Sequence, residues 1–168
     1  MGAGISNYII DLREAVNRAA PKLLGLGDAS AARPRPDRWS AREIIGHLVD
    51  SAINNYGRCV RGQLQEDLVF LGYAQDDWVR IGRYRDAPWD ELVTLWRLLN
   101  LQLARVMEGT PADVRQRPRG KHSFDAIGVA LAPGEAATLE HIMSDYVAHL
   151  EHHLLQIFPE MEKSGRSR

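Results

Sequence analysis

Residues 145–157 read Asp-Tyr-Val-Ala-His-Leu-Glu-His-His-Leu-Leu-Gln-Ile and carry three of the six histidines of the chain. On an α-helix, His149 and His153 lie four residues apart, so their side chains emerge one turn apart on the same face, with Cβ atoms roughly 5–6 Å from each other. Two imidazoles at this separation can bind one metal ion. The spacing alone is a weak indication, because it also arises by chance or in hydrogen-bonded core histidines. A metal site needs a third ligand from elsewhere in the chain.

The helical phase separates the third histidine of this stretch from the other two. At roughly 100° per residue, His152 falls about 60° to one side of His149, and His153 falls about 40° to the other. The apolar residues at helical spacing lie on the side of His153: Leu139, Ile142, Tyr146, Leu150, Leu154 and Ile157. We therefore expect His149 and His153 to border the buried face and His152 to lean toward solvent.

The composition is that of one globular domain covering residues 1–168. The chain has 168 residues, 45% of them hydrophobic, and a net charge of -1, which is not typical of nucleic-acid-binding or membrane-surface proteins. Its single cysteine, Cys59, excludes an intramolecular disulfide. The N-terminus lacks the pattern of a signal peptide, and no apolar run approaches the ~18 residues of a membrane span. We expect a cytoplasmic protein that binds neither nucleic acid nor membrane.

The clearest helix start is Trp-Ser-Ala-Arg-Glu-Ile at residues 39–44. Ser40 is a suitable N-cap, and Glu43 at the third helical position completes a capping box. We expect this helix to run from Ser40 to about Gln65. Its apolar face consists of Ile45, Leu48, Val49, Ala52, Tyr56, Cys59 and Val60. A polar stripe consists of His47, Asp50, Asn54, Arg58 and Arg61. The simplest interpretation of this stripe is a solvated surface.

Three further helices are indicated by apolar residues at helical spacing. The first has Ser6 as N-cap and ends at two glycines after residue 24, although Pro21 could kink it or end it early. The others follow Pro88 and Thr138. The predicted core face of the helix after Pro88 consists of Leu92, Leu95, Trp96, Leu99, Leu103 and Val106. The connections 66–87 and 112–134 lack sustained periodicity, and residues 164–168 form a polar tail. The sequence predicts an all-α four-helix bundle with two long connections.

In such a bundle His47 and the pair of histidines near the C-terminus meet if the second and fourth helices are neighbours. The order of features then resembles the DinB-like family of metal-binding four-helix proteins, which includes YfiT-type members. The features are Pro36-Asp37-Arg38-Trp39-Ser40, then Glu43, His47 and Asp50, and finally His149, His152, His153, Gln156 and Ile157. The similarity covers nearly the whole chain.

The resemblance implies that His47, His149 and His153 bind one divalent metal ion, commonly nickel or zinc. It also implies an up-down-down-up bundle that is frequently a homodimer. Three neutral imidazoles leave coordination positions open for water or substrate, as in catalytic metal sites. Imidazole binds zinc, nickel, copper and iron alike, so the residues do not identify the metal.

The family resemblance implies a metal-dependent enzyme acting on a small molecule, either a hydrolase or an S-transferase that uses a low-molecular-weight thiol such as bacillithiol or mycothiol. The alternative is a non-catalytic metal-binding stress-response protein, in which the ion chiefly stabilises the bundle. In a further alternative, this member has lost its metal, and His47 and His149 are core-edge histidines satisfied by Asp50 or backbone groups. DNA binding is suggested only by the damage-inducible name of the family, and the near-neutral charge argues against it.

Four more residues are candidates for holding substrate or orienting the ligands. Asp50, Asn54 and Arg58 lie on the His47 side of the second helix, where they either serve the site or are ordinary surface residues. Tyr146 lies about one turn from His149 and is either a hydrogen-bond donor to a bound group or a core aromatic.

Three other features have simpler interpretations. Cys59 lies about 120° from His47 and is expected to be a small buried side chain. His141 drifts roughly 80° from His149 and is an unlikely ligand. The basic segment Arg115–Lys121 is either an anion-binding loop or a solvated loop.

Overall fold

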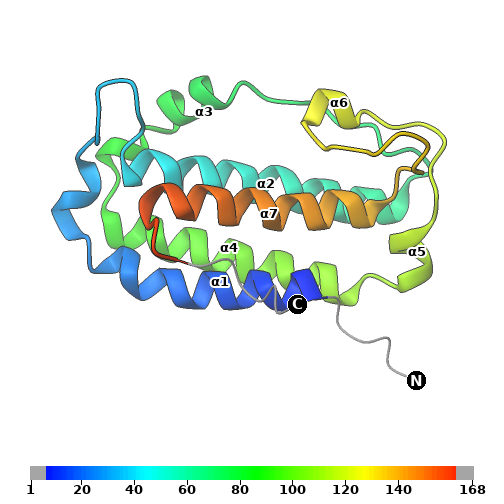
Figure 1. The fold of residues 1–168 in the computed structure, drawn as a ribbon, viewed down its shortest axis with the longest axis horizontal. Coiled ribbons are helices and arrows are strands. Elements are labelled where there is room, and N and C mark those ends of the chain that lie inside the picture. Colours follow the sequence, from blue (N-terminus) through cyan, green and yellow to red (C-terminus); the bar gives the residue numbers. More distant parts are fainter. Residues whose placement is uncertain (1–6, 162–168) are drawn as a thin grey trace.

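The computed structural model describes residues 7–161, and four long α-helices form a bundle there (Figure 1). They are α1 (Asn7–Leu24), α2 (Ala41–Leu64), α4 (Trp89–Gly109) and α7 (Leu139–Ile157). The shorter helices are η1 (Gly27–Ala31), α3 (Gln75–Gly82), η2 (Tyr84–Asp86), α5 (Ala112–Gln116) and α6 (Phe124–Ile127). Pairing between extended segments is limited to two isolated bridges in the described part. The predicted all-α four-helix bundle is confirmed.

The bundle has the up-down-down-up arrangement. In Figure 1, α1 and α7 run in one direction, and α2 and α4 run in the opposite direction. Around the bundle the neighbours are α1 with α4, α4 with α2, α2 with α7, and α7 with α1. Because α2 and α4 are parallel neighbours, the chain between them must return along the whole bundle, and α3 and η2 lie on this return. The second and fourth long helices are adjacent, as the meeting of the histidines requires.

Most predicted helix ends agree with the structure. Ser40 and Glu43 form the expected capping box at the start of α2, and Gln65 is the C-cap. Pro21 lies inside α1, which continues to Leu24, so the helix does not end early at this proline. The proposed N-cap Ser6 and the predicted tail 164–168 lie outside the described residues.

The core faces differ from prediction at three points. Tyr56 on α2 and Leu95 on α4 are exposed, and Val93 is buried in place of Leu95 because α4 packs against both α1 and α2. The polar stripe of α2 is not the solvated surface that its simplest interpretation suggested. His47 and Arg58 are buried on it, because α7 packs against α2 and the long connections pass over this side of the bundle.

The two long connections position the site. The segment with α3 and the segment with α6 both pass over the α2–α7 side of the bundle (Figure 1). Between Asn7 and Met161, no helix combines the length and the hydrophobicity that a membrane span requires.

Candidate metal centre and adjoining cavity

The start of α2 places His47 inside the bundle. The carboxylate of Glu43 accepts a hydrogen bond from the Ser40 backbone N–H at 2.9 Å and pairs with the guanidinium of Arg33. These contacts fix the first turn, and the second turn carries His47, which is only 1% exposed. The ring of Trp39 lies beside the imidazole, with the two centroids 5.2 Å apart.

The three predicted ligands converge through their Nε2 atoms. His47 Nε2 lies 3.2 Å from His149 Nε2, and His153 Nε2 lies 3.1 Å from the same atom. One ring nitrogen from each histidine lies within 4.8 Å of the other two. The four-residue spacing on α7 brings His149 and His153 together, and the packing of α2 against α7 adds His47.

These separations suit a single transition-metal ion. Two nitrogens that are each about 2.0–2.1 Å from one ion lie 3.1–3.2 Å apart when the angle at the ion is about 100°, between the octahedral and tetrahedral values. Imidazole is a suitable ligand for zinc, nickel, copper and iron. Three protein ligands leave at least one coordination position for another molecule, as in catalytic sites.

The protonation states also suit a metal. Burial, with smaller contributions from His153 and His149, lowers the pKa of His47 to about 3. Burial and the neighbouring His153 and His152 lower the pKa of His149 to about 4. Burial also lowers the pKa of His153, although its hydrogen bond to Gln156 opposes the shift. All three imidazoles are therefore neutral at pH 7 and offer the lone pairs that a metal ion needs.

Contacts on the other ring nitrogens orient one ligand and leave another unpaired. His153 Nδ1 lies 3.0 Å from Gln156 Oε1, so Nδ1 donates and Nε2 keeps its lone pair. His47 Nδ1 is buried and has no hydrogen-bond partner within residues 7–161. The alternative in which Asp50 satisfies His47 is wrong, because Asp50 Oδ1 instead accepts the hydroxyl of Tyr84 at 2.5 Å.

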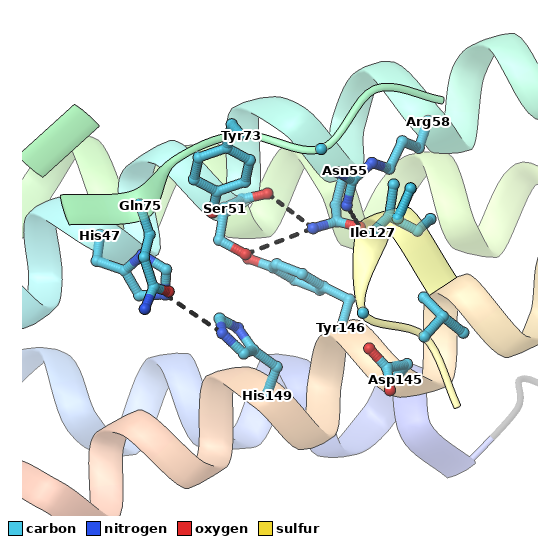
Figure 2. A pocket seen from close by; sticks show the side chains of 14 residues that line it. His47, Ser51, Asn55, Arg58, Tyr73, Gln75, Ile127, Asp145, Tyr146 and His149 are labelled. Carbon is cyan, nitrogen blue, oxygen red and sulfur yellow. Dashed lines mark hydrogen bonds between the residues drawn. The ribbon is translucent and has the colours of Figure 1, made fainter. Parts of the chain in front are cut away.

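A cavity of about 290 Å³ adjoins the imidazoles of His47 and His149 (Figure 2). Its volume is at the lower end of the range for small-molecule sites. Helices α2 and α7 form its walls, and the connection segments 72–75 and 126–129 cover it. We call this the α2–α7 cavity.

Two of the four further candidates line the α2–α7 cavity. Arg58 is a buried lining residue, so it is not the ordinary surface residue of the other interpretation. Tyr146 also lines the cavity, but its hydroxyl donates a hydrogen bond to Asn100 Oδ1 at 2.5 Å. Since Asn100 and Tyr146 are both buried, the phenol serves the core as well as the cavity wall.

The other two candidates do not line this cavity. The Asn54 side chain donates to the backbone oxygen of Asp50, one turn earlier in the same helix, and lines a separate hollow beside α3. The Asp50 carboxylate is buried and faces Tyr84. A role for either residue in holding substrate has no support from the geometry of the cavity.

Five polar lining residues were not predicted. Ser51 and Asn55 follow His47 at four and eight residues, and Asp145 precedes His149 by four residues, so helical spacing could have identified all three. Tyr73 and Gln75 also line the cavity. They lie in a connection without periodicity, which offered no comparable signal.

His152, Cys59 and His141 lie outside the histidine cluster and do not line the α2–α7 cavity. His152 is exposed, as predicted. Burial raises the pKa of the Cys59 thiol to about 12, which agrees with a small buried side chain. His141 belongs to the capping box of α7 and lies 2.9 Å from a carboxylate oxygen of Glu135.

The basic segment Arg115–Lys121 lies outside the α2–α7 cavity, and it is only partly the solvated loop of one alternative, because two of its cations are buried. Arg115 is buried and pairs with Glu140 at 3.1 Å. Arg119 is buried and donates to the backbone oxygens of Gln65 at 2.7 Å and Gly62 at 3.1 Å. These two guanidinium groups tie the segment to the ends of α2 and α7.

The comparisons with known proteins agree with this geometry. A protein of Bacillus licheniformis that is provisionally named a metal-dependent hydrolase is 24% identical over 163 residues, which are 96% of this chain and 87% of that protein. The solved structure of YfiT from Bacillus subtilis, described as a "probable metal-dependent hydrolase with an unusual four-helix bundle topology", has a TM-score of 0.71 and 22% identity. The match covers 90% of this chain and 82% of YfiT, and at this identity it supports the fold. The model of the DinB superfamily matches residues 12–157, and the chain belongs to this family.

Proposed function

We propose that this protein is a metal-dependent enzyme in which His47, His149 and His153 bind one divalent transition-metal ion. The observation that carries the proposal is the convergence of three neutral imidazoles beside a cavity large enough for a small molecule, with the Nε2 atoms of His47 and His153 3.2 and 3.1 Å from that of His149. We expect zinc or nickel, since both accept imidazole ligands.

Different residues of the chain would bind the metal ion, orient its ligands and line the cavity. A divalent ion held there acts as a Lewis acid and lets a water molecule or a thiol lose its proton near neutral pH. The three imidazoles, one buried and two partly buried, supply unprotonated donors, and Gln156 holds His153 in the required tautomer. The ring of Tyr146 and the side chains of Ile127 and Val129 line the cavity and limit access of bulk water.

Hydrolysis of a small molecule is the first candidate reaction. Its support is the pair of relatives, both of which carry the description of metal-dependent hydrolase, together with the open three-ligand arrangement. A purely structural ion usually has four protein ligands, which favours catalysis over simple stabilisation of the bundle.

A thiol-dependent S-transferase is the second candidate, and a second cavity favours it. This cavity, of about 510 Å³, lies beside His153 and is lined also by Trp39 and Arg38. Gln75 lines both cavities. A transferase brings two molecules to one centre: the thiolate sulfur forms a bond to an electrophilic carbon, the leaving group departs with its electron pair, and the thiol proton is released. Two cavities flanking one histidine cluster suit that requirement.

The metal content of the protein tests the shared part of both candidates. We expect elemental mass spectrometry of tag-free protein, reconstituted with zinc or nickel, to find close to one ion per chain. His149→Ala should lose most of the metal, whereas His152→Ala, on the same helix but exposed, should keep it. Equal metal content in all three proteins, or no metal in the parent, contradicts the three-histidine site.

Activity assays then separate the candidates. The metal-loaded protein is incubated with a panel of activated esters and amides, and separately with cysteine and an electrophilic aryl halide. Metal-dependent ester or amide cleavage supports the hydrolase, and metal-dependent thiol consumption supports the transferase. A protein that binds metal, gains stability and turns over neither panel has the non-catalytic role.

A further inference from the structure

The end of the α2–α7 cavity away from the imidazoles carries one positive and one negative side chain. Arg58 lies on α2 and Asp145 lies on α7, and both line the cavity (Figure 2). Each influences the pKa of the other, so they are within electrostatic range. No ion pair within 4.0 Å joins them in the described chain. The two opposite charges share one cavity without contact.

Arg58 is a buried cation, and several of its N–H groups make no hydrogen bond within the described part of the protein. It is 7% exposed. Its Nη1 lies 3.4 Å from Asn55 Oδ1, and its Nη2 donates to the Leu71 backbone oxygen at 3.2 Å. A guanidinium has five N–H groups in a planar fork that matches a carboxylate, so most of its donors are left for a ligand. Burial lowers the pKa of Arg58, but an arginine remains charged at neutral pH.

Asp145 is a partly buried carboxylate without a hydrogen-bond or ion-pair partner in residues 7–161. Burial raises its pKa, and the nearby positive charge of Arg58 opposes that shift. A partly desolvated carboxylate without a partner is unfavourable until a cation or donor approaches it. It is therefore suited to accept hydrogen bonds from an ammonium group in the cavity.

We propose that this end of the α2–α7 cavity binds the zwitterionic head of an α-amino acid, with the ligand carboxylate on Arg58 and the ligand ammonium on Asp145. In an α-amino acid the ammonium and carboxylate groups are attached to the same carbon atom. Their separation matches that of two opposite protein charges that are close but not in contact. A ligand with only a carboxylate leaves Asp145 without a partner, and one with only an amine leaves Arg58 without one. The cavity of about 290 Å³ suits a single amino-acid derivative and not a long peptide.

The position of this head-group site gives the substrate class of the proposed enzyme, and this step rests on the proposed function. Asp145 precedes His149 by one turn of α7, about 6 Å along the helix axis. The side chain of an amino acid held at Asp145 is therefore within reach of the imidazole cluster. The reacting group, such as a thiol or an ester, is carried on that side chain.

Three matched probes test the head-group site without requiring catalysis. They are S-methyl-L-cysteine, 3-(methylthio)propanoate, which lacks the ammonium, and 2-(methylthio)ethylamine, which lacks the carboxylate. Each is titrated into the ¹⁵N-labelled full chain, metal-free and zinc-loaded, and Kd is taken from amide chemical shifts. We expect S-methyl-L-cysteine to bind at least about tenfold more tightly than either analogue, because each loses a charge-assisted hydrogen bond.

Two substitutions assign the discrimination to the two residues. Asp145→Asn should bring S-methyl-L-cysteine and 3-(methylthio)propanoate to within about twofold of each other, while the preference over the amine persists. Arg58→Met should remove the preference over the amine, and Arg58→Lys should keep part of it. Arg61→Met, at an exposed arginine of the same helix that does not line this cavity, is the matched control and should leave all three affinities unchanged.

The outcomes distinguish this inference from the proposed function. Equal binding of the three probes to the parent, or equal effects of Arg58→Met and Arg61→Met, overturns the head-group site. If Arg58→Met does not fold, Asp145→Asn and Arg58→Lys decide in its place. Discrimination in a protein that binds no metal supports the inference and refutes the proposed function. Metal binding without discrimination does the reverse.

Discussion

Helices α1 and α2 differ in the polarity of the residues that they bury. Every buried residue of α1 is apolar, whereas the buried residues of α2 include a charged and polar set. This set consists of Glu43, His47, Asp50, Ser51, Asn55 and Arg58. Helix α1 packs on α4 and α7, and α2 packs on α4 and α7 from the opposite side of the bundle. Both helices therefore contribute apolar side chains to the core, but of the two only α2 also carries buried residues of the candidate site.

The sharpest test of this division is a truncation in α1. Leu12 is fully buried, and Leu12→Ala should lower the free energy of unfolding by about 2–5 kcal/mol through lost burial and the resulting cavity. Urea unfolding monitored by circular dichroism measures the loss. The folded variant should still bind metal at the stoichiometry of the parent. A loss of metal that accompanies a small loss of stability would show that α1 supports the site directly.

The free energy of unfolding should depend on pH through the histidines between α2 and α7, whereas the buried face of α1 has no titratable side chain. The pKa of His47 is lowered to about 3 and that of His149 to about 4 from an ordinary 6.5, so below pH 6.5 the unfolded chain takes up protons that the folded metal-free chain does not. Stability is then complete above about pH 7 and falls as the pH decreases from 6.5 toward 4. Each such histidine contributes a slope of up to about 1.4 kcal/mol per pH unit.

Urea unfolding of metal-stripped protein at several pH values between 7.5 and 4.5 measures this slope. His47→Gln should flatten the profile by removing one of the contributing groups, and the exposed His152→Gln is the matched control. A profile for His47→Gln that is as steep as that of the parent would mean that burial of this imidazole does not set the pH dependence.

Two glycines of α2 provide the smallest test, with effects of opposite sign. A Cβ at Gly46 would lie 2.1 Å from a ring carbon of Tyr84, whereas a Cβ at Gly57 meets nothing closer than 3.8 Å. Gly46→Ala should therefore destabilise the fold by about 1–3 kcal/mol and displace the ring that holds Asp50. Gly57→Ala should stabilise it by up to about 1 kcal/mol, since alanine favours the helix.

Thermal and urea unfolding of both glycine variants measure whether each substitution raises or lowers the free energy of unfolding. If both substitutions stabilise the protein, Tyr84 can move without cost, and its contact with Gly46 does not maintain the polar side of α2.

The sequence was sufficient for the helices, the bundle and the convergence of three histidines. Periodicity and the Ser40 capping box define α2, and the four-residue spacing of His149 and His153 puts both on one face of α7. The family resemblance supplied His47 as the third member and the direction of each helix. The helices and the histidine spacing are local patterns that can be read from one sequence. The remaining features are shared with the family, so the resemblance was enough to predict them.

The α2–α7 cavity was less accessible to prediction, because it depends on segments that are distant in sequence. From the sequence, Arg58 was either a site residue or an ordinary surface residue, and only the packing of α7 and of the connection containing Leu71 shows that it is buried. Asp145 lay within the quoted stretch, yet nothing in the sequence placed it opposite Arg58. Tyr73 and Gln75 reach the cavity through a connection whose path is set by tertiary packing and not by its own periodicity.

The covering of the cavity by two connections has a consequence for how new specificities arise. The imidazoles are fixed by long helices, whereas segments 72–75 and 126–129 enter the cavity from the connections between those helices. Mutation, insertion or exchange of these segments can reshape the space offered to a ligand while the histidine cluster and the α1 face stay intact. The architecture thus allows substrate choice to evolve, or to be engineered, separately from the machinery that folds the chain.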